Sequence, residues 1–326
     1  ESSAGSLMTP EYVRLRQEMT VSDAFAAIRK QGENAETVYT CYVVERNRLK
    51  GVVSARSLLL SEPHTSITEI MDDNVVTVKV TDDQEYVARE MQRYDFTAMP
   101  VLDNEGMFVG IITIDDAIDV LTDESTEDMQ KMAAILPDDD ATTYFGTSVW
   151  THAKQRIPWL LILMLSATLT SMVLTSYENA LAACAALTAF IPMLTGTGGN
   201  SGTQASVAVI RGLSLGEVEF SDTLRVVWKE VRVAVLCGAT LAACNFVKLL
   251  VVDRMLLHNE GVTVMVAAVI CVTMVFTVLC AKVVGCLLPL LAQRIHLDPA
   301  VMASPFISTV VDVVTLLIYF QVARAI

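Results

Sequence analysis

The chain has 326 residues, more than a single typical domain, and 53% of them are hydrophobic, with a mean hydropathy of +0.48. Residues 1–150 hold 28 acidic and 12 basic residues, whereas residues 151–326 hold 9 acidic and 11 basic residues. This division predicts a soluble, acidic first half and a membrane-embedded second half. An acidic surface repels nucleic acid and attracts cations, so DNA and RNA are excluded as partners.

The sequence offers little that would indicate an enzyme or a zinc site. None of the seven cysteines has CxxC spacing, and six lie in apolar segments, where a free thiol behaves as a small hydrophobic group. The sequence has no HExxH or GxxxxGK[ST] segment, and its four histidines are dispersed. We therefore expect neither an enzyme nor a disulfide framework.

Residues 8–60 and 71–121 are two copies of one unit. Each copy has a short strand, an amphipathic helix, two strands around a polar turn and a second helix. Each copy is expected to be a self-contained βαββα unit, although neither copy alone would bury much core. The first copy is expected to have strands at 12–15, 40–44 and 49–53 and a helix at 21–31; the second has strands at 75–80, 98–102 and 108–112 and a helix at 83–93.

Each copy ends in a glycine, two aliphatic residues and a hydroxyl residue. The second copy reads Gly110-Ile-Ile-Thr113-Ile-Asp-Asp116, and the first has Ser57 where the second has Asp116. These endings resemble those of CBS domains, in which the hydroxyl and the Asp contact the ribose and phosphate of an adenine nucleotide. The alternative is that Ser54 and Thr113 only cap helices. The resemblance implies ATP as a ligand, with contacts at Tyr39, Arg56 and Phe96.

Five apolar stretches follow, each close to or above the roughly 20 residues that span a bilayer. Basic residues in the short loops lie mainly on the side of the soluble half, which is therefore expected to be cytoplasmic, with the C-terminus outside. The protein is then a multi-pass protein of the plasma (inner) membrane. The expected spans are 157–177, 180–211, 223–251, 262–291 and 299–325.

The second expected span contains a segment with four glycines, residues 195–204. Glycine costs about 1 kcal/mol per residue in a helix interior relative to alanine. The segment therefore indicates either close helix packing or backbone that lines a water-filled path.

Asp312 lies within the fifth expected span, on one helix face with Ser304, Ser308 and Thr315. An unpaired carboxylate in hydrocarbon is costly. Asp312 is therefore expected either to contact water and cations or to bond a neighbouring helix. Lys282, in the fourth span, either pairs with Asp312 or extends toward the cytoplasmic edge.

Two CBS-like units, five spans, the segment GTGGNSGTQ at 196–204 and the segment SPFISTVVD at 304–312 together resemble the MgtE family of magnesium channels. The resemblance implies an α+β multi-domain fold in which a tandem βαββα module precedes an all-α, five-helix membrane domain. It also implies a homodimer in membrane lipid, with a pore formed by the second and fifth spans. The expected domains are residues 8–66, 67–124 and 156–326, joined by a gating helix at 125–155; residues 1–7 resemble the end of the acidic helical domain that precedes the CBS pair in the family.

The function that the resemblance implies is a Mg²⁺-selective channel for hydrated divalent cations. Asp312 from two subunits would hold the ion through its water shell, with Ser308 and Ser304 as lining residues. The family often has Asn in place of Ser304, Gly in place of Thr315 and Asn in place of Lys282. A carrier for another divalent cation, such as Mn²⁺ or Co²⁺, is the alternative.

The end of the soluble half is acidic, and like charges at helical spacing repel. This pattern indicates either a solvated face or a site for cations. By resemblance, cytosolic Mg²⁺ binds there and closes the channel. The implied ligands of this regulatory Mg²⁺ are Glu85, Asp95, Asp116, Asp119, Glu124, Glu127, Asp128 and Asp298.

Overall fold

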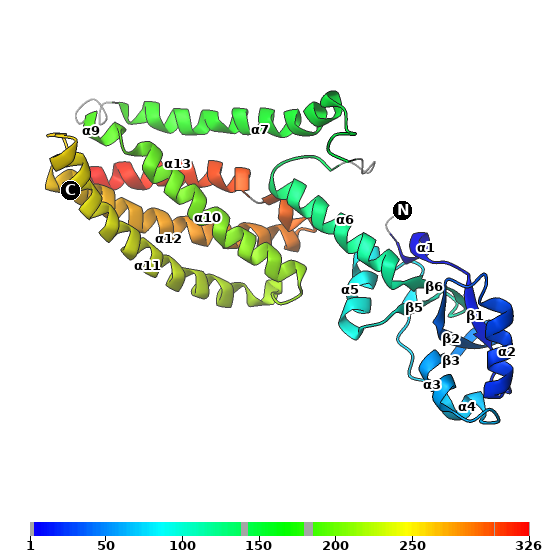
Figure 1. Cartoon of the computed structure of the whole chain (residues 1–326). Coiled ribbons are helices and arrows are strands. Elements are labelled where there is room, and N and C mark those ends of the chain that lie inside the picture. Colours follow the sequence, from blue (N-terminus) through cyan, green and yellow to red (C-terminus); the bar gives the residue numbers. More distant parts are fainter. Residues whose placement is uncertain (1–2, 138–142, 179–184, 303, 326) are drawn as a thin grey trace. The chain divides into compact units, whose positions relative to one another are not determined.

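The computed structural model describes residues 3–137, 143–178, 185–302 and 304–325; for residues 185, 186 and 304 it describes the backbone alone. The chain divides into two compact units, Glu1–Thr126 and Glu127–Ile326 (Figure 1). The boundary lies 24 residues before residue 150, where the sequence analysis divided the acidic half from the apolar half. Each unit is described below by itself.

The first copy of the repeat forms a three-stranded sheet of order β1-β2-β3, in which β1 is parallel to β2 and β2 is antiparallel to β3. A capping box at Thr20 and Asp23 starts the helix at 21–31, because each side chain accepts a hydrogen bond from the other residue's backbone N–H. The elements are α1 (Ala4–Leu7), β1 (Tyr12–Leu15), α2 (Val21–Gln31), β2 (Thr37–Glu45), β3 (Arg48–Ser54), α3 (Ala55–Leu60) and α4 (Ile67–Ile70).

The second copy repeats this topology with the sheet β4-β5-β6. Its elements are β4 (Val78–Lys79), α5 (Gln84–Tyr94), β5 (Ala98–Leu102), β6 (Phe108–Thr113) and α6 (Ile114–Met132). The strand expected at 75–80 is reduced to two paired residues. Val75 and Val76 instead line a pocket between the copies, where they have no strand partner.

Each copy has its own apolar core, and a third cluster joins them. The joining cluster is built around Tyr42, Val44, Phe108 and Ile111. The ring of Phe108 lies 4.6 Å from that of Tyr12 and 5.2 Å from that of Tyr42, between centroids. The two copies therefore share a third apolar cluster in addition to their separate cores.

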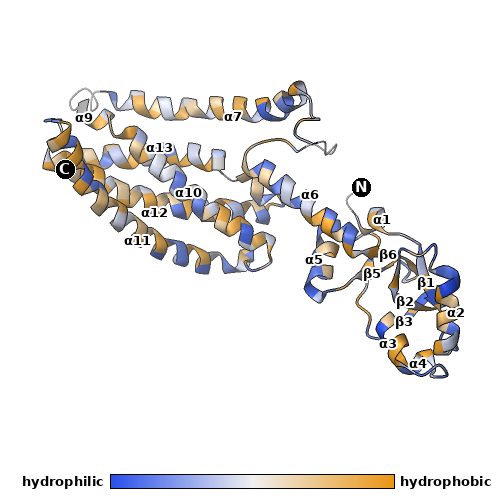
Figure 2. Ribbon diagram, viewed as in Figure 1, coloured by the Kyte–Doolittle hydropathy of each residue, from blue (hydrophilic) through white to orange (hydrophobic). Residues whose placement is uncertain are grey.

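The second unit is helical. Its elements are α7 (Val149–Ser176), α9 (Ala185–Thr188), α10 (Ile191–Ser214), η1 (Phe220–Asp222), α11 (Thr223–Lys248), the π-helix η2 (Leu249–Leu256), α12 (Val264–Arg294), η3 (Pro299–Met302) and α13 (Ser304–Ala325). Hydrophobic residues occur all along α7, α11 and α12 (Figure 2).

Within the described residues, four helical stretches are long and apolar enough to cross a membrane: Val149–Ser176, Phe220–Leu256, Val264–Arg294 and Pro299–Ala325. The second expected span, 180–211, corresponds to α10, which has 24 residues and carries the glycines. Residues 180–184 of that span lie outside the described part of the chain.

The gating helix expected at 125–155 is not one continuous helix. The helix α6 ends at Met132, and Ala134 has the left-handed φ of 55° that commonly follows a helix end. Pro137 disfavours helical backbone at the residue before it. A new helix, α7, begins when the Ser148 hydroxyl accepts a hydrogen bond from the N–H of Thr151 at 3.1 Å. Asp138–Asp140 lie outside the described residues.

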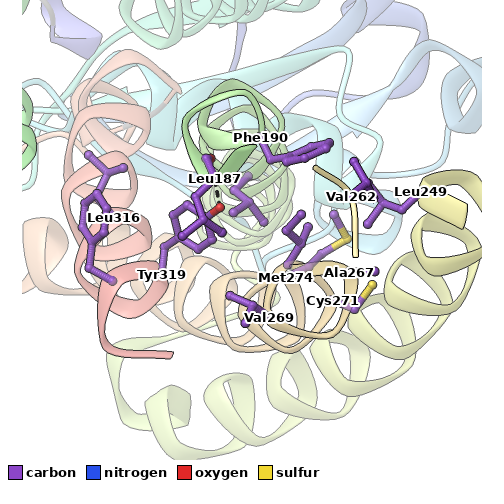
Figure 3. Packing of buried hydrophobic residues seen from close by; sticks show 13 residues of the cluster. Leu187, Phe190, Leu249, Val262, Ala267, Val269, Cys271, Met274, Leu316 and Tyr319 are labelled. Atoms are coloured by element: carbon purple, nitrogen blue, oxygen red, sulfur yellow. Dashed lines mark hydrogen bonds between the residues drawn. The ribbon is translucent and has the colours of Figure 1, made fainter. Parts of the chain in front are cut away.

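The largest core of the second unit lies near the end of α10 that begins at Ile191 (Figure 3). Buried residues from α9, α10, α12 and α13 meet there, including Phe190, Leu194, Met274 and Phe320. The Tyr319 hydroxyl donates a 2.9 Å hydrogen bond to the carbonyl of Leu187, which satisfies a polar group inside the core. This core fixes the rotation of α13 about its axis, and so the direction in which Asp312 points.

Candidate functional site

The glycine-rich segment of α10 packs directly against α12 and α13. A Cβ placed on Gly285 of α12 would lie 2.2 Å from the carbonyl oxygen of Gly202, which no side chain could tolerate. A Cβ on Gly198 would lie 2.8 Å from Thr277 of α12 and 2.9 Å from the Thr315 hydroxyl of α13. These glycines therefore allow three helix backbones to approach closely.

Asp312 lies on α13, one turn beyond Ser308, and is half-buried. Within the described part of the chain, its carboxylate has no hydrogen bond and no ion pair. The predicted bond to a neighbouring helix is therefore not formed, and neither is the predicted pair with Lys282. An acidic side chain without a protein partner at this depth needs water or a cation.

Ser308 faces α10, because its hydroxyl oxygen lies 3.2 Å from the Cβ position of Gly199. Ser304 is the first residue of α13, and its side chain lies outside the described part of the structure. The structure thus brings Ser308 against the glycine-rich segment, one turn from Asp312.

Several hydroxyls on the three packed helices are buried and, among the described residues, have no hydrogen-bond partner. Thr315 is 1% exposed and Thr277 is 1% exposed, and both flank Gly198. Ser206 of α10 and Thr273 of α12 are also buried without a partner. A helical Ser or Thr often donates its hydroxyl to the backbone carbonyl one turn earlier. These four hydroxyls make no such bond among the described residues, so they remain able to bond water. The sequence carries no signal for Thr277, because only its position against Gly198 in the folded chain sets it apart.

Lys282 has a different partner from those considered in the sequence analysis. Its Nζ lies 3.6 Å from Oε2 of Glu230 on α11, and the two side chains are 6% and 13% exposed. Glu230 lies within the third expected span, 223–251, so an acidic residue inside an apolar stretch was a signal available in the sequence.

The acidic residues of the first unit that were predicted to bind regulatory Mg²⁺ are mostly engaged with protein groups. Asp116 accepts a 2.8 Å hydrogen bond from the Thr113 hydroxyl, and Glu124 accepts one of 3.1 Å from Gln84. Glu85 forms an ion pair with Arg89, whereas Asp119 is exposed. Three of the five acidic residues predicted in the first unit therefore already have a protein partner.

In the second unit, Lys131 lies between two of the predicted Mg²⁺ ligands. Its Nζ lies 2.6 Å from Oδ2 of Asp298 and also forms an ion pair with Glu127. Burial alone would lower the pKa of Lys131, but the hydrogen bonds to Asp298 and Glu127 outweigh it and raise the pKa above its usual value. The lysine is therefore a fixed cation that links the end of α6 to the start of the fifth span. Asp128, another predicted ligand, is half-buried on α6.

Among the described residues, no three His, Cys, Asp or Glu side chains come close enough together to hold a metal ion. The eight predicted ligands of regulatory Mg²⁺ are therefore not gathered into one site by either unit alone. Asp95, in the first unit, ends α5 with a left-handed φ of 54° and lines a pocket.

That pocket, of about 210 Å³, lies between the two copies of the repeat. Ser54, Asp95 and Phe96 contribute to its lining, whereas Tyr39 and Arg56 are exposed and do not. The Ser54 hydroxyl also caps α3 by accepting a 3.0 Å hydrogen bond from the N–H of Ser57. The structure thus places one of the three predicted nucleotide contacts, Phe96, at a cleft that could accept a planar ring.

The fold and these features define the class: a membrane protein in which a tandem CBS module precedes a bundle of apolar helices. The CBS family model matches residues 4–62 and 67–123, and the MgtE model, described as a divalent cation transporter, matches residues 191–322. The chain is 42% identical to the "Magnesium transporter MgtE" of Thermus thermophilus and 36% identical to that of Bacillus subtilis. Each alignment covers 99% of this chain, with 70% and 69% of the relatives covered. The chain belongs to the MgtE family of divalent cation transporters, which are not enzymes.

Two solved structures are similar to part of this chain. One is a cytosolic domain of the Mg²⁺ channel MgtE in complex with ATP, with 51% identity and a TM-score of 0.36. The other is the soluble part of a magnesium transporter, with 42% identity and a TM-score of 0.38. The matches cover 37% and 38% of this chain and about half, 49%, of each solved chain.

Proposed function

We propose that this protein is a Mg²⁺-selective channel that admits hydrated divalent cations across the plasma (inner) membrane. The observation that carries the proposal is the Asp312 carboxylate, which lies half-buried in an apolar helix and has no partner among the described residues. Family membership supports divalent cations as the substrate.

The chemistry around Asp312 suits an ion that keeps its water shell. Mg²⁺ gives up water reluctantly and is usually held through a few carboxylates and its own waters. The Asp312 carboxylate can accept hydrogen bonds from such waters, and the unpaired hydroxyls of Thr315 and Thr277 can exchange bonds with them. A single subunit supplies one carboxylate, so we propose a homodimer in which two copies of Asp312 face one ion.

The orientation we propose places the CBS module in the cytoplasm and the C-terminus outside. The excess of basic residues in loops on the side of the first unit supports this orientation. Cytosolic Mg²⁺ then reaches the acidic residues of the first unit and of α6.

We further propose that cytosolic Mg²⁺ closes the channel. The proposed ligands are eight acidic residues: Glu85, Asp95, Asp116, Asp119, Glu124, Glu127, Asp128 and Asp298. Open probability measured against internal Mg²⁺ tests the gate. A fall between micromolar and tens of millimolar Mg²⁺ is expected, and a flat response rules the gate out.

An adenine nucleotide such as ATP is the ligand we propose for the pocket between the two copies. Phe96 can stack on the base, and the Ser54 hydroxyl can bond the ribose. Phe96→Ala should weaken ATP binding about tenfold or more in equilibrium dialysis, since base stacking on an aromatic ring is worth about 1–3 kcal/mol. ATP binding by Phe96→Ala equal to that of the wild type would contradict an adenine nucleotide as the ligand of this pocket.

The test of transport is Mg²⁺ flux into liposomes that contain the purified protein. Asp312→Ala should reduce flux to background, because the carboxylate that faces the ion is lost, while size-exclusion chromatography shows an intact protein. Asp312→Glu is the matched control, which keeps the charge. Flux of Asp312→Ala equal to wild type would exclude this carboxylate as the ion site.

A carrier for another divalent cation, such as Mn²⁺ or Co²⁺, is the second candidate, because the same carboxylate and hydroxyls would also hold those ions. Single-channel currents separate the two mechanisms, since a carrier produces none. Competition by Mn²⁺, Co²⁺ and Ca²⁺ in the flux assay ranks the ions.

A further inference from the structure

Lys282 of α12 and Glu230 of α11 form a largely buried ion pair. The two charged groups lie 3.6 Å apart and are 6% and 13% exposed, and each lies in a helical stretch that is long and apolar enough to cross a membrane. Taking both charges out of water often costs more than their attraction returns, and a well-packed apolar pair would often do as well or better. A pair of charges in such a place therefore suggests a role beyond holding two helices together.

Lys282 lies on the stretch of α12 whose backbone contacts the glycine-rich helix α10. Ala281, the residue before Lys282, has its carbonyl oxygen 3.1 Å from the Cβ position of Gly202. Gly285, three residues after Lys282, is in backbone contact with Gly202. Since α10 contacts α13 through Gly199 and Ser308, no further layer of side chains separates α12 from the helices that carry the candidate ion path.

A positive charge at this position acts against the transport of cations. The interaction between charges falls only slowly with distance, and an apolar surrounding with little water screens it weakly. A divalent ion is repelled twice as strongly as a monovalent one. An adjacent carboxylate turns the single charge into a dipole, whose effect on the ion falls off much faster.

We propose that Glu230 neutralises Lys282 and thereby prevents the lysine from repelling the divalent cation at Asp312. Glu230 is then a positioning residue for transport, although it does not touch the ion. This inference rests on the proposed function, because it presumes that a cation passes along α10 and α13.

The experiment compares Mg²⁺ flux for Glu230→Gln, Lys282→Met and the double variant E230Q/K282M. Glu230→Gln leaves the lysine unpaired and should raise the Mg²⁺ concentration for half-maximal flux by about tenfold. Lys282→Met leaves a negative charge, which attracts cations, and should stay within about twofold of wild type. The double variant, which removes both charges, should return to the level of Lys282→Met.

A purely structural role predicts a different pattern. Either single variant would then leave a buried charge unpaired and reduce the maximal rate, so Lys282→Met would lose as much flux as Glu230→Gln. That outcome, or a Glu230→Gln variant with wild-type flux, overturns the proposal. Glu230→Asp, which keeps the charge, should behave like wild type.

If Glu230→Gln does not give a monodisperse protein, the charge can be added after folding. In E230Q/K282C, a thiol reagent that carries a positive charge should reduce flux, whereas a neutral reagent of similar size should not. The same reagents on E230Q/K282M control for the seven native cysteines. Equal effects of the two reagents on E230Q/K282C overturn the proposal. Absence of flux in wild type would instead refute the proposed function.

Discussion

The two units of this protein treat their polar side chains differently. In the CBS module, hydroxyls and carboxylates at the ends of helices bond one another, as Thr113 does with Asp116. In the membrane unit, Asp312 has no partner among the described residues, and Thr315 and Thr277 are buried without one. Buried polar groups in proteins are nearly always hydrogen-bonded, so exceptions that gather in one place need a reason. The contrast separates polar groups that stabilise the fold from polar groups that are free to contact water or an ion.

One residue of the CBS module breaks this contrast. The hydroxyl of Tyr42 is buried and has no hydrogen-bond partner among the described residues. Burial raises the pKa of Tyr42 above its ordinary value, because the phenolate would be poorly solvated. Its ring is needed for the cluster that joins the two copies, and the hydroxyl is a cost of placing a tyrosine there.

The largest effect is expected from the closest helix contact of the membrane unit. Gly285→Ala places a Cβ 2.2 Å from the backbone oxygen of Gly202, and a backbone atom cannot move aside as a side chain can. We expect a loss of about 3 kcal/mol in the free energy of unfolding, measured by thermal unfolding in detergent.

Gly196→Ala is the matched control for this contact. No atom lies within 4 Å of the added Cβ, and alanine is favoured over glycine in a helix by up to about 1 kcal/mol. We expect unchanged or higher stability. If both substitutions destabilise the protein equally, the close contact between the backbones at Gly285 and Gly202 is not the reason why position 285 needs a glycine.

The same substitution at one threonine in each unit tests the contrast between the two units. Thr113→Val removes a hydrogen bond to a carboxylate and should cost the CBS module about 1 kcal/mol. Thr315→Val removes a buried hydroxyl that has no partner, so it should leave stability equal or higher but reduce Mg²⁺ flux several-fold. Thermal unfolding and liposome flux measure the two effects. Wild-type flux for Thr315→Val would place this hydroxyl outside the ion path.

The smallest effect is expected at Tyr42. Tyr42→Phe removes the buried hydroxyl while keeping the ring, and should raise the stability of the CBS module by up to about 1 kcal/mol. Chemical denaturation followed by circular dichroism measures the change. A decrease in stability would indicate that this hydroxyl has a bonding partner in solution, and would place Tyr42 with the satisfied groups of the module.

The sequence by itself determined the tandem repeat, the strands and helices of both copies and the apolar helices that follow. These features depend on periodicity and on composition over short stretches of chain, which a sequence displays directly. Residues 133–137 were the main local failure: the family resemblance implied one helix over 125–155, whereas the chain leaves the helix after Met132, near Ala134 and Pro137.

Only the tertiary structure decided which buried groups meet. The sequence offered Asp312 as a partner for Lys282, whereas the folded chain pairs Lys282 with Glu230 and leaves Asp312 without a protein partner in the described residues. The reason is that the partner of a charge in a helix bundle depends on how each helix is rotated about its axis. That rotation is fixed by contacts between distant segments, such as Gly202 against Gly285, and no local pattern in the sequence encodes it.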